Sequence, residues 1–288
     1  MTIHTELASH WPAYTLLDSG DGYRLEQFGA YTVARPDPNV LWSKHLPESA
    51  WVRADATFQR GEGGGWQAKD SQVLEGWKVQ FEQATFKVRP TPFRHLGIFP
   101  EQAAHWSWLA ETISSAPSPK PRILNLFAYT GAASVIAAQS GAQVTHVDAS
   151  KSSIAWAHEN AALSGLPGDA IRWLCDDVVA FLAREARRGN RYDLIILDPP
   201  VFGRGPKGQI WRLEEGIVEL VQQAASLLSA QPLGFLLNFY ATAIYPQALY
   251  RAVDEVLAGR FPQLRLGSLC LSERAGETIL PTGFFIRS

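Results

Sequence analysis

The sequence predicts an α/β protein, with a doubly wound and largely parallel seven-stranded sheet behind a small β-rich N-terminal domain. From residue 122 onward, short apolar runs alternate with segments of helical periodicity, which is typical of a parallel sheet. Residues 1–95 show short alternating stretches between turns instead. Three prolines within residues 116–121 separate the two patterns, because such a segment cannot be helix interior.

The N-terminal part is expected to form a small β domain at residues 1–95, with substrate recognition as its candidate role. Strands are predicted at Tyr23–Phe28, Tyr31–Ala34 and Val79–Glu82. Seven of the ten tryptophans precede residue 122, and we expect them to fill this small core rather than to form a stacking surface. A helical linker follows at residues 96–121.

The α/β domain is placed at residues 122–288. Helical segments separate its first five expected strands, whereas only a polar segment joins the last two, so that final pair is predicted to be antiparallel. The seven expected strands are Ile123–Phe127, Gln143–Val147, Ala170–Leu174, Tyr192–Leu197, Gly234–Phe239, Leu264–Leu271 and Ile279–Ile286.

The composition narrows the class of protein. The net charge of −2 is evenly divided, with 12 basic against 13 acidic residues up to residue 122 and 14 against 15 beyond it. Proteins that bind a phosphate backbone are usually more basic. The sequence has no membrane-length apolar run, no signal-peptide layout and only two cysteines. We therefore predict a cytoplasmic protein without a metal site or a membrane partner, and leave monomer and homodimer open.

A loop at Asn125–Ser134 follows the first strand of the α/β domain and opens a helix. Ligands of open α/β sheets bind beyond the carboxyl ends of the strands. The loop holds a single glycine rather than the G-x-G-x-x-G pattern that wraps a pyrophosphate. This favours a cofactor without phosphates, S-adenosylmethionine, although an ordinary strand-to-helix turn is the competing interpretation. The candidate cofactor contacts in the loop are Asn125, Phe127, Tyr129, Thr130 and Gly131.

Carboxylates also follow the next two strands. Asp148 ends the second strand, where a carboxylate can accept hydrogen bonds from both ribose hydroxyls. Asp176 and Asp177 follow the third; we prefer Asp177 as the acceptor for the adenine amine, since Val178 would then pack on the adenine face. A helix N-cap is the alternative explanation in both places. The predicted contacts here are Asp148, Ala149, Ser150, Asp176, Asp177 and Val178.

The fourth strand ends in Asp198-Pro199-Pro200, followed by Val201 and Phe202. Consecutive prolines fix a rigid turn that directs a carboxylate and a proline carbonyl into the mouth of the sheet. Two such acceptors can hold a planar amine in line with a methyl sulfonium, and an aromatic ring can stack on a planar substrate. The predicted catalytic residues are Asp198, Pro199, Pro200 and Phe202, with Asp198 also near the cofactor.

The loop at residues 203–208 carries Arg204 and Lys207, which are candidates for closing over a substrate phosphate. A solvated turn explains them equally well. Residues 184–212 hold seven Lys and Arg against three acids, the most basic stretch of the chain.

These motifs resemble the bacterial large-subunit ribosomal RNA methyltransferases that produce 5-methylcytosine or 7-methylguanosine. The resemblance spans residues 96–288 and implies a Rossmann-like methyltransferase sheet, S-adenosylmethionine as cofactor and ribosomal RNA as a partner. It also implies that Phe99 and Gln102 line the cofactor pocket and that Asn160 lies close to it. The resemblance rests on the segments Leu96–Gln102, Asn125–Ser134, His146–Ser150, Ala157–Asn160, Asp176–Val178 and Asp198–Phe202.

Two features depart from that family. Members that make 5-methylcytosine attack the base with a cysteine after the fifth strand, and this sequence has Ala241 there. Neither Cys175 nor Cys270 is placed on a catalytic loop, so both are expected to be core residues. Many members also carry an N-terminal RNA-binding domain of the PUA type, which residues 1–95 do not resemble.

Methyl transfer to a nucleobase nitrogen, without a covalent cysteine intermediate, is therefore the predicted activity. Asn238 and Tyr240, at the end of the fifth strand, are predicted to read the edge of the substrate. Methylation of a protein or a small molecule is one alternative, favoured by the near-neutral charge. An NAD-dependent dehydrogenase is another; it explains the sheet and Asp148, but not the single-glycine loop or the proline pair.

Overall fold

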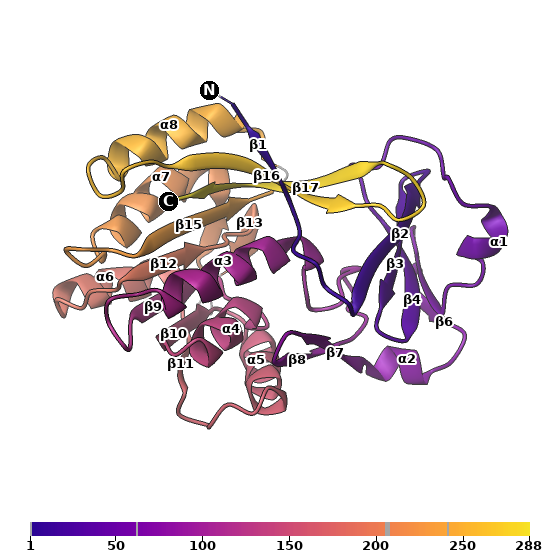
Figure 1. Ribbon diagram of the computed structural model, residues 1–288, viewed down its shortest axis with the longest axis horizontal. Coiled ribbons are helices and arrows are strands. Elements are labelled where there is room, and N and C mark those ends of the chain that lie inside the picture. Colours follow the sequence, from indigo (N-terminus) through magenta and orange to yellow (C-terminus); the bar gives the residue numbers. More distant parts are fainter. Residues whose placement is uncertain (1, 62, 205–207, 241) are drawn as a thin grey trace. The chain divides into compact units, whose positions relative to one another are not determined.

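The computed structural model of the chain describes residues 2–61, 63–204, 208–240 and 242–288 (Figure 1). The chain groups into two compact units. The first, called the α/β unit here, comprises Met1–Glu6, His105–Ser268 and Gly283–Ser288. The second, called the β unit, comprises Leu7–Ala104 and Leu269–Thr282. No helix in the described ranges combines the length and the apolar character needed to cross a membrane.

An eight-stranded sheet has the order β1-β16-β17-β15-β12-β9-β10-β11. The strands β15, β12, β9, β10 and β11 run parallel, and β17 runs antiparallel to β15. All seven expected strands are present, which confirms the predicted fold class, and β1 adds a strand at the edge. The bounds are His4–Leu7 (β1), Arg122–Leu126 (β9), Gln143–Asp148 (β10), Ile171–Cys175 (β11), Leu194–Leu197 (β12), Gly234–Phe239 (β15), Arg265–Ser272 (β16) and Ile279–Arg287 (β17).

The central strands consist almost entirely of apolar residues, because both faces of each strand are covered. Every residue of β12 and of β15 is buried, as expected for parallel strands between helices. The strands β9 and β12 are neighbours in the sheet although about 70 residues separate them in the chain. The strand order therefore reverses between them, and ligands of such sheets bind at this point.

Helices cover both faces of the sheet (Figure 1). Apolar side chains of α6, α7 and α8 share one buried cluster with Leu237 and Phe239 of β15. The side chain of Asn238 points to the opposite face, because successive strand residues alternate, and α3 lies there. The helix bounds are Ala103–Ser114 (α3), Ala132–Gln139 (α4), Lys151–Leu163 (α5), Val178–Arg187 (α6), Leu213–Ala225 (α7) and Pro246–Val256 (α8). A hairpin, Phe202–Arg204 (β13) with Ile210–Arg212 (β14), lies between β12 and α7.

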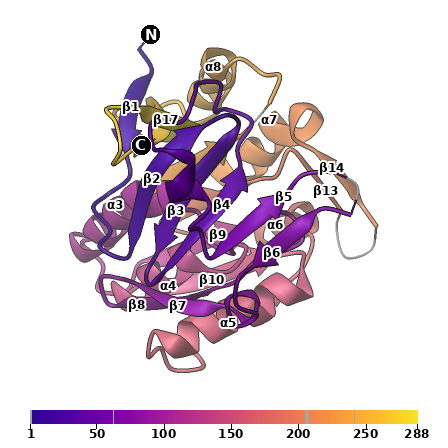
Figure 2. The ribbon, with the colours of Figure 1, turned by 90° about the vertical axis from the view of Figure 1, so that its right-hand side faces the viewer.

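The β unit contains a five-stranded sheet of order β2-β3-β4-β5-β6 and a separate hairpin β7–β8 (Figure 2). Only the β4–β5 pairing in the five-stranded sheet is parallel. The predicted strands near residues 23, 31 and 79 are confirmed as β3, β4 and β7. The bounds are Tyr14–Gly20 (β2), Tyr23–Phe28 (β3), Tyr31–Pro36 (β4), Glu48–Trp51 (α1), Ala56–Gln59 (β5), Gly65–Ala68 (β6), Gln72–Glu75 (α2), Trp77–Phe81 (β7), Ala84–Val88 (β8) and the 3₁₀ helix Pro100–Gln102 (η1).

The core of the β unit draws on distant parts of the chain. Trp11 and Trp51 are buried, and Trp11 packs edge-on against Phe81 with ring centroids 5.8 Å apart, as expected for aromatic core filling. In a separate buried cluster, Leu16 and Val40 pack with Leu271 and Leu280 of the β16–β17 hairpin. The tip of that hairpin is thus part of the β unit.

Candidate cofactor and active site

The loop after β9 has a strained backbone. Phe127 and Tyr129 have φ angles of 55° and 50°, and Gly131 has 84°. The left-handed region costs a residue with a side chain about 1–2 kcal/mol, so the surrounding structure must hold the loop in place. The Ala128 amide donates to the Val147 carbonyl (3.1 Å), and the Gly131 amide donates to the Ala128 carbonyl (3.0 Å).

Gly131 is required here for a second reason. A Cβ atom built on it would lie 2.9 Å from the Cβ of Ala157 in α5. The loop and α5 therefore meet at a distance that only glycine allows. This close approach fits the single glycine that the sequence analysis identified.

Asp148 is half-buried and joins this loop to the end of β10. Its Oδ2 accepts a hydrogen bond from the Tyr129 amide and its Oδ1 accepts one from the Ser150 amide, both at 2.8 Å. Burial raises the pKa of Asp148 above its ordinary value, and the two amides offset part of that rise. Ser150, not Asp148, caps α5, through the Ser153 amide. The Asp148 carboxylate is thus fixed at the strand end without capping the helix.

Buried polar side chains support the loop from the sheet side. Asn125 donates to Ser134 Oγ (2.9 Å), which in turn lies 2.9 Å from His146 Nδ1. Asn160 donates to the Thr130 carbonyl (2.9 Å). Burial lowers the pKa of His146 to about 3, so its imidazole is neutral. Asn125 and Asn160 thus lie behind the loop and hold its shape through Ser134 and the Thr130 carbonyl. The roles of Ser134 and His146 could not be predicted from the sequence.

The carboxylates after β11 have structural partners. Asp177 Oδ1 accepts from the Ala180 amide (2.8 Å) and caps α6. Asp176 pairs with Arg184 and also accepts from the Asp177 amide. Val178, the first residue of α6, is buried in the core cluster. The helix-cap explanation thus holds for Asp177, and an adenine contact there would use its other carboxylate oxygen.

The Asp198-Pro199-Pro200 turn lies beside the cofactor loop. The Asp198 amide donates to the Leu126 carbonyl at the end of β9 (3.3 Å). The Pro200 carbonyl accepts from Trp211 Nε1 of β14 (2.7 Å), and the Trp211 ring lies 5.8 Å from that of Phe127. Trp211 therefore links the proline turn to the cofactor loop. This residue could not be predicted from the sequence, because nothing in the pattern of β14 shows what its ring contacts.

The residues predicted to contact the substrate differ in exposure. Phe202 is 53% exposed, and Arg204 is exposed on the same strand. Lys207 lies outside the described residues. Asn238 is 1% exposed and hydrogen-bonds to His105 of α3, whereas the Tyr240 ring lies against Gly283.

Phe99 and Gln102 belong to the β unit. The Gln102 amide donates to the Phe99 carbonyl (3.0 Å) at the 3₁₀ helix η1. The Phe99 ring packs on His95 with a centroid separation of 5.2 Å. Gln102 itself is buried.

The two cysteines differ from expectation in one respect. Cys270 is buried as predicted, but Cys175 is exposed, so its placement in the core was wrong. Cys175 is the last residue of β11, an edge strand of the sheet. An edge strand has a neighbouring strand on one side only.

The carboxyl ends of the central strands suit S-adenosylmethionine. Leu126 pairs with both Val147 and Leu197, which brings the ends of β9, β10 and β12 side by side. Two carboxylates, Asp148 and Asp198, follow at these ends. They offer acceptors for ribose hydroxyls and negative charge for the cationic groups of the cofactor. The residues present therefore fit the predicted cofactor.

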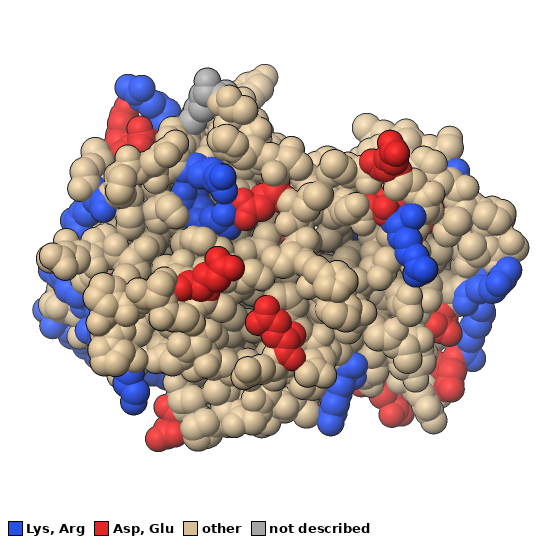
Figure 3. All heavy atoms as spheres, in the orientation of Figure 1, with Lys and Arg blue, Asp and Glu red and all other residues tan. Residues whose placement is uncertain are grey.

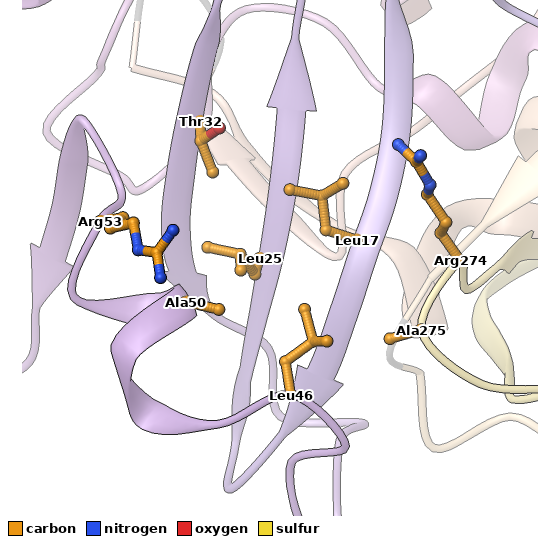
Figure 4. A pocket seen from close by; sticks show the side chains of 8 residues that line it. All are labelled: Leu17, Leu25, Thr32, Leu46, Ala50, Arg53, Arg274 and Ala275. Carbon is orange, nitrogen blue, oxygen red and sulfur yellow. The ribbon is translucent and has the colours of Figure 1, made fainter.

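A separate cavity of about 440 Å³ lies within the β unit and contains none of the predicted site residues. Figure 4 shows its apolar wall of leucines and alanines, with Arg53 and Arg274 on opposite sides. The lining residues are Leu17, Leu25, Thr32, Leu46, Ala50, Arg53, Arg274 and Ala275.

Comparisons with known proteins place the chain among methyltransferases. Ribosomal RNA large subunit methyltransferase I of Aeromonas salmonicida is 32% identical over 181 residues, which cover 62% of this chain and 45% of that protein. Ribosomal RNA large subunit methyltransferase K/L of Shewanella baltica is 34% identical over 166 residues, which cover 57% and 22%. This chain spans less than half the length of these curated relatives.

A solved structure also matches along the whole chain. The S-adenosylmethionine-dependent methyltransferase from Agrobacterium tumefaciens is 39% identical, with a TM-score of 0.94, over 100% of this chain and 93% of that one. The family model described as S-adenosylmethionine-dependent methyltransferase matches residues 57–245. These matches exclude the dehydrogenase alternative. The chain belongs to the S-adenosylmethionine-dependent methyltransferase family, and S-adenosylmethionine is its cofactor.

Proposed function

We propose that this chain methylates a nitrogen of a nucleobase in RNA without a covalent intermediate. The observation that most directly supports this proposal is the Asp198-Pro199-Pro200 turn, which lies where the strand order reverses between β9 and β12. Since the Pro200 carbonyl already accepts from Trp211, the acceptors proposed for the substrate amine are the Asp198 carboxylate and the Pro199 carbonyl. Together they orient the nitrogen lone pair, and the exposed Phe202 ring stacks on the base.

Asp148 and the loop at residues 127–131 are proposed to hold the cofactor. Asp148 would accept hydrogen bonds from the ribose hydroxyls, and the strained loop offers backbone groups beside it. The cofactor, when bound, supplies the electrophilic methyl group. The protein's own contribution is positioning, since methyl transfer is an in-line displacement.

The positions of the cysteines support a mechanism without a covalent intermediate. Cys175 ends β11, which is separated from β12 by β10 and β9. Three strand spacings of about 4.8 Å place these two strands roughly 14 Å apart. Cys270 is buried. Neither thiol of the described residues is therefore placed to attack a base held by Asp198.

Two observations support RNA as the substrate. The curated relatives named above are ribosomal RNA methyltransferases, and the basic segment at residues 184–212 contains the Asp198 turn. Charges of both signs are scattered over the face in Figure 3, and basic side chains line the left edge of that view, where Figure 1 draws α6. The binding surface is thus proposed to be local rather than a strongly basic domain.

The test is methylation of ribosomal RNA by the full chain with labelled S-adenosylmethionine, followed by mass spectrometry of the released nucleosides. A nucleoside methylated on nitrogen is expected. Asp198→Ala should abolish the product, whereas Cys175→Ser should retain it. Product methylated at carbon 5 of cytosine, or loss of activity in Cys175→Ser, would overturn the proposed mechanism. Label only in protein or small molecules would favour the alternative substrates.

A further inference from the structure

The β unit contains a cluster of three side chains from segments far apart in the chain. Asp18 lies in β2, His45 in the loop before α1, and Glu273 directly after β16. One ligand atom from each lies within 4.8 Å of the other two. Both carboxylates are fully buried, while the His45 side chain is 41% exposed. This cluster has no part in the methyl-transfer site described above.

The distances within the cluster match those around a small metal ion. His45 Nδ1 lies 3.4 Å from Asp18 Oδ1 and 3.2 Å from Glu273 Oε2. A tetrahedral zinc ion with bonds of about 2.1 Å holds its ligand atoms about 3.4 Å apart. The donor set of one imidazole and two carboxylates is also one that zinc accepts.

The two carboxylates are held rigidly by backbone and indole donors. Asp18 Oδ2 accepts from the Leu46 amide (2.8 Å) and from Trp51 Nε1 (2.9 Å). Glu273 Oε1 accepts from the Ser19 amide. Asp18 Oδ1 accepts from the Ser19 amide (2.9 Å) and the His45 amide (3.2 Å) and also lies near the His45 ring, as does Glu273 Oε2. Such support around the ligands is characteristic of metal sites.

Glu273 Oε2 is the atom that points to a missing ligand. It is buried and makes no hydrogen bond of acceptable geometry among the described residues. A buried acceptor without a partner costs about 1–3 kcal/mol, and two buried carboxylates side by side repel each other when both are ionised. A cation between them would satisfy both conditions.

Gly276 keeps the remaining side of the cluster open. A Cβ atom built on it would lie 3.3 Å from Glu273 Oε2 and 3.5 Å from His45 Nδ1. The exposed edge of His45 gives access from solvent. On the protein side, the cavity in Figure 4 is lined by Leu46 and Arg274, the chain neighbours of two of the three ligands.

The geometry points to a divalent metal site in the β unit, formed by Asp18, His45 and Glu273, with zinc as the ion that fits it. The ion would tie the tip of the β16–β17 hairpin to β2 and to the loop before α1. A fourth position, on the side that Gly276 leaves open, would hold water or another small ligand. The sequence did not indicate this site, because the three ligands are 27 and 228 residues apart in the chain.

The experiment is a titration of the chelator-treated full chain with Zn²⁺, and separately with Co²⁺, by calorimetry and visible absorption. One ion per chain is expected. His45→Ala and Glu273→Gln should each weaken binding at least tenfold, whereas His10→Ala and Glu277→Gln, exposed residues of the same types, should bind as the wild type does. Gly276→Ala, which keeps all three ligands, should also weaken binding because its methyl group enters the open side.

Thermal melting with and without Zn²⁺ gives a second measurement. The wild type should melt at a higher temperature with Zn²⁺, and the two ligand variants should lose that shift while still binding S-adenosylhomocysteine, which shows that they fold. No stoichiometric uptake of either ion would overturn the proposal and leave the hydrogen bond between the Asp18 and Glu273 side chains as the explanation for the cluster. Uptake that is unchanged in His45→Ala and Glu273→Gln would also overturn it.

Discussion

The backbone amide of Tyr129 donates a hydrogen bond of 2.8 Å to Oδ2 of Asp148. This bond joins a residue in the left-handed region, in the loop after β9, to the carboxylate at the end of β10. The Ser150 amide holds the other carboxylate oxygen. Loop shape and carboxylate orientation therefore depend on each other, and a change in either one should affect cofactor binding.

Asp148→Asn should weaken the binding of S-adenosylhomocysteine at least tenfold, which corresponds to about 1.4 kcal/mol. The amide has one acceptor oxygen, so its NH₂ group would face a backbone N–H that the carboxylate accepts from. Isothermal titration calorimetry measures the change. Asp169→Asn, at an exposed aspartate, is the control. Equal affinities for Asp148→Asn and wild type would show that Asp148 does not bind the ribose.

As the pH is lowered, the affinity for S-adenosylhomocysteine should begin to fall at a higher pH than it would if Asp148 had the pKa of an ordinary aspartate. Burial raises the pKa of Asp148, and a protonated carboxyl cannot accept from two hydroxyls. As the pH falls through that raised pKa, affinity should drop up to tenfold per pH unit. Calorimetry between about pH 4 and pH 8 tests this. The same profile in Asp148→Asn would assign the dependence to another group.

Gly131→Ala should destabilise the protein and weaken cofactor binding. The substitution adds strain at φ 84° and a contact of 2.9 Å with Ala157. Gly141→Ala is a matched control, since Gly141 has φ 99° but no atom within 4 Å of an added Cβ. In both variants, backbone strain should lower the free energy of unfolding by about 1 kcal/mol. Gly131→Ala should lower it further, because of the contact with Ala157. Urea unfolding measures both free energies. Equal decreases would mean that α5 shifts to accommodate the new methyl group.

Trp211→Phe should lower the rate of methyl transfer and leave the affinity for S-adenosylhomocysteine nearly unchanged. The variant removes the bond from Nε1 to the Pro200 carbonyl but keeps a ring beside Phe127. Loss of one such bond is worth about 1 kcal/mol, or roughly a fivefold effect. Trp66→Phe, which removes an indole bond to the Thr91 carbonyl in the β unit, should retain the wild-type rate. A lower rate in Trp66→Phe together with a wild-type rate in Trp211→Phe would argue against a role for Trp211 in holding the turn.

Much of the α/β unit could be predicted because its signals are local. The apolar run of β12 and the proline pair after it fix a strand and its end. The single glycine of the cofactor loop has a positive φ and a close neighbour, as a glycine in a tight turn does. Each of these features depends on residues within a few positions of one another in the chain.

The partners of side chains were harder to foresee, because a strand's periodicity shows which face a residue occupies but not what covers that face. Asn238 alternates with the core residues Leu237 and Phe239, and α3 supplies His105 opposite it. Cys175 looked like core, yet it ends an edge strand. Sequence order says little about either contact, since both depend on where distant elements pack.

The hairpin tip at Leu269–Thr282 has a consequence for synthesis on the ribosome. Leu16 and Val40 leave the exit tunnel early, but their cluster is complete only with Leu271 and Leu280. About 165 residues separate Ala104 from Leu269, and translation at roughly 5–20 residues per second takes about ten to thirty seconds to cover them. During that interval the nascent β unit exposes an incomplete apolar face, which makes it a natural client for chaperones that shield such surfaces.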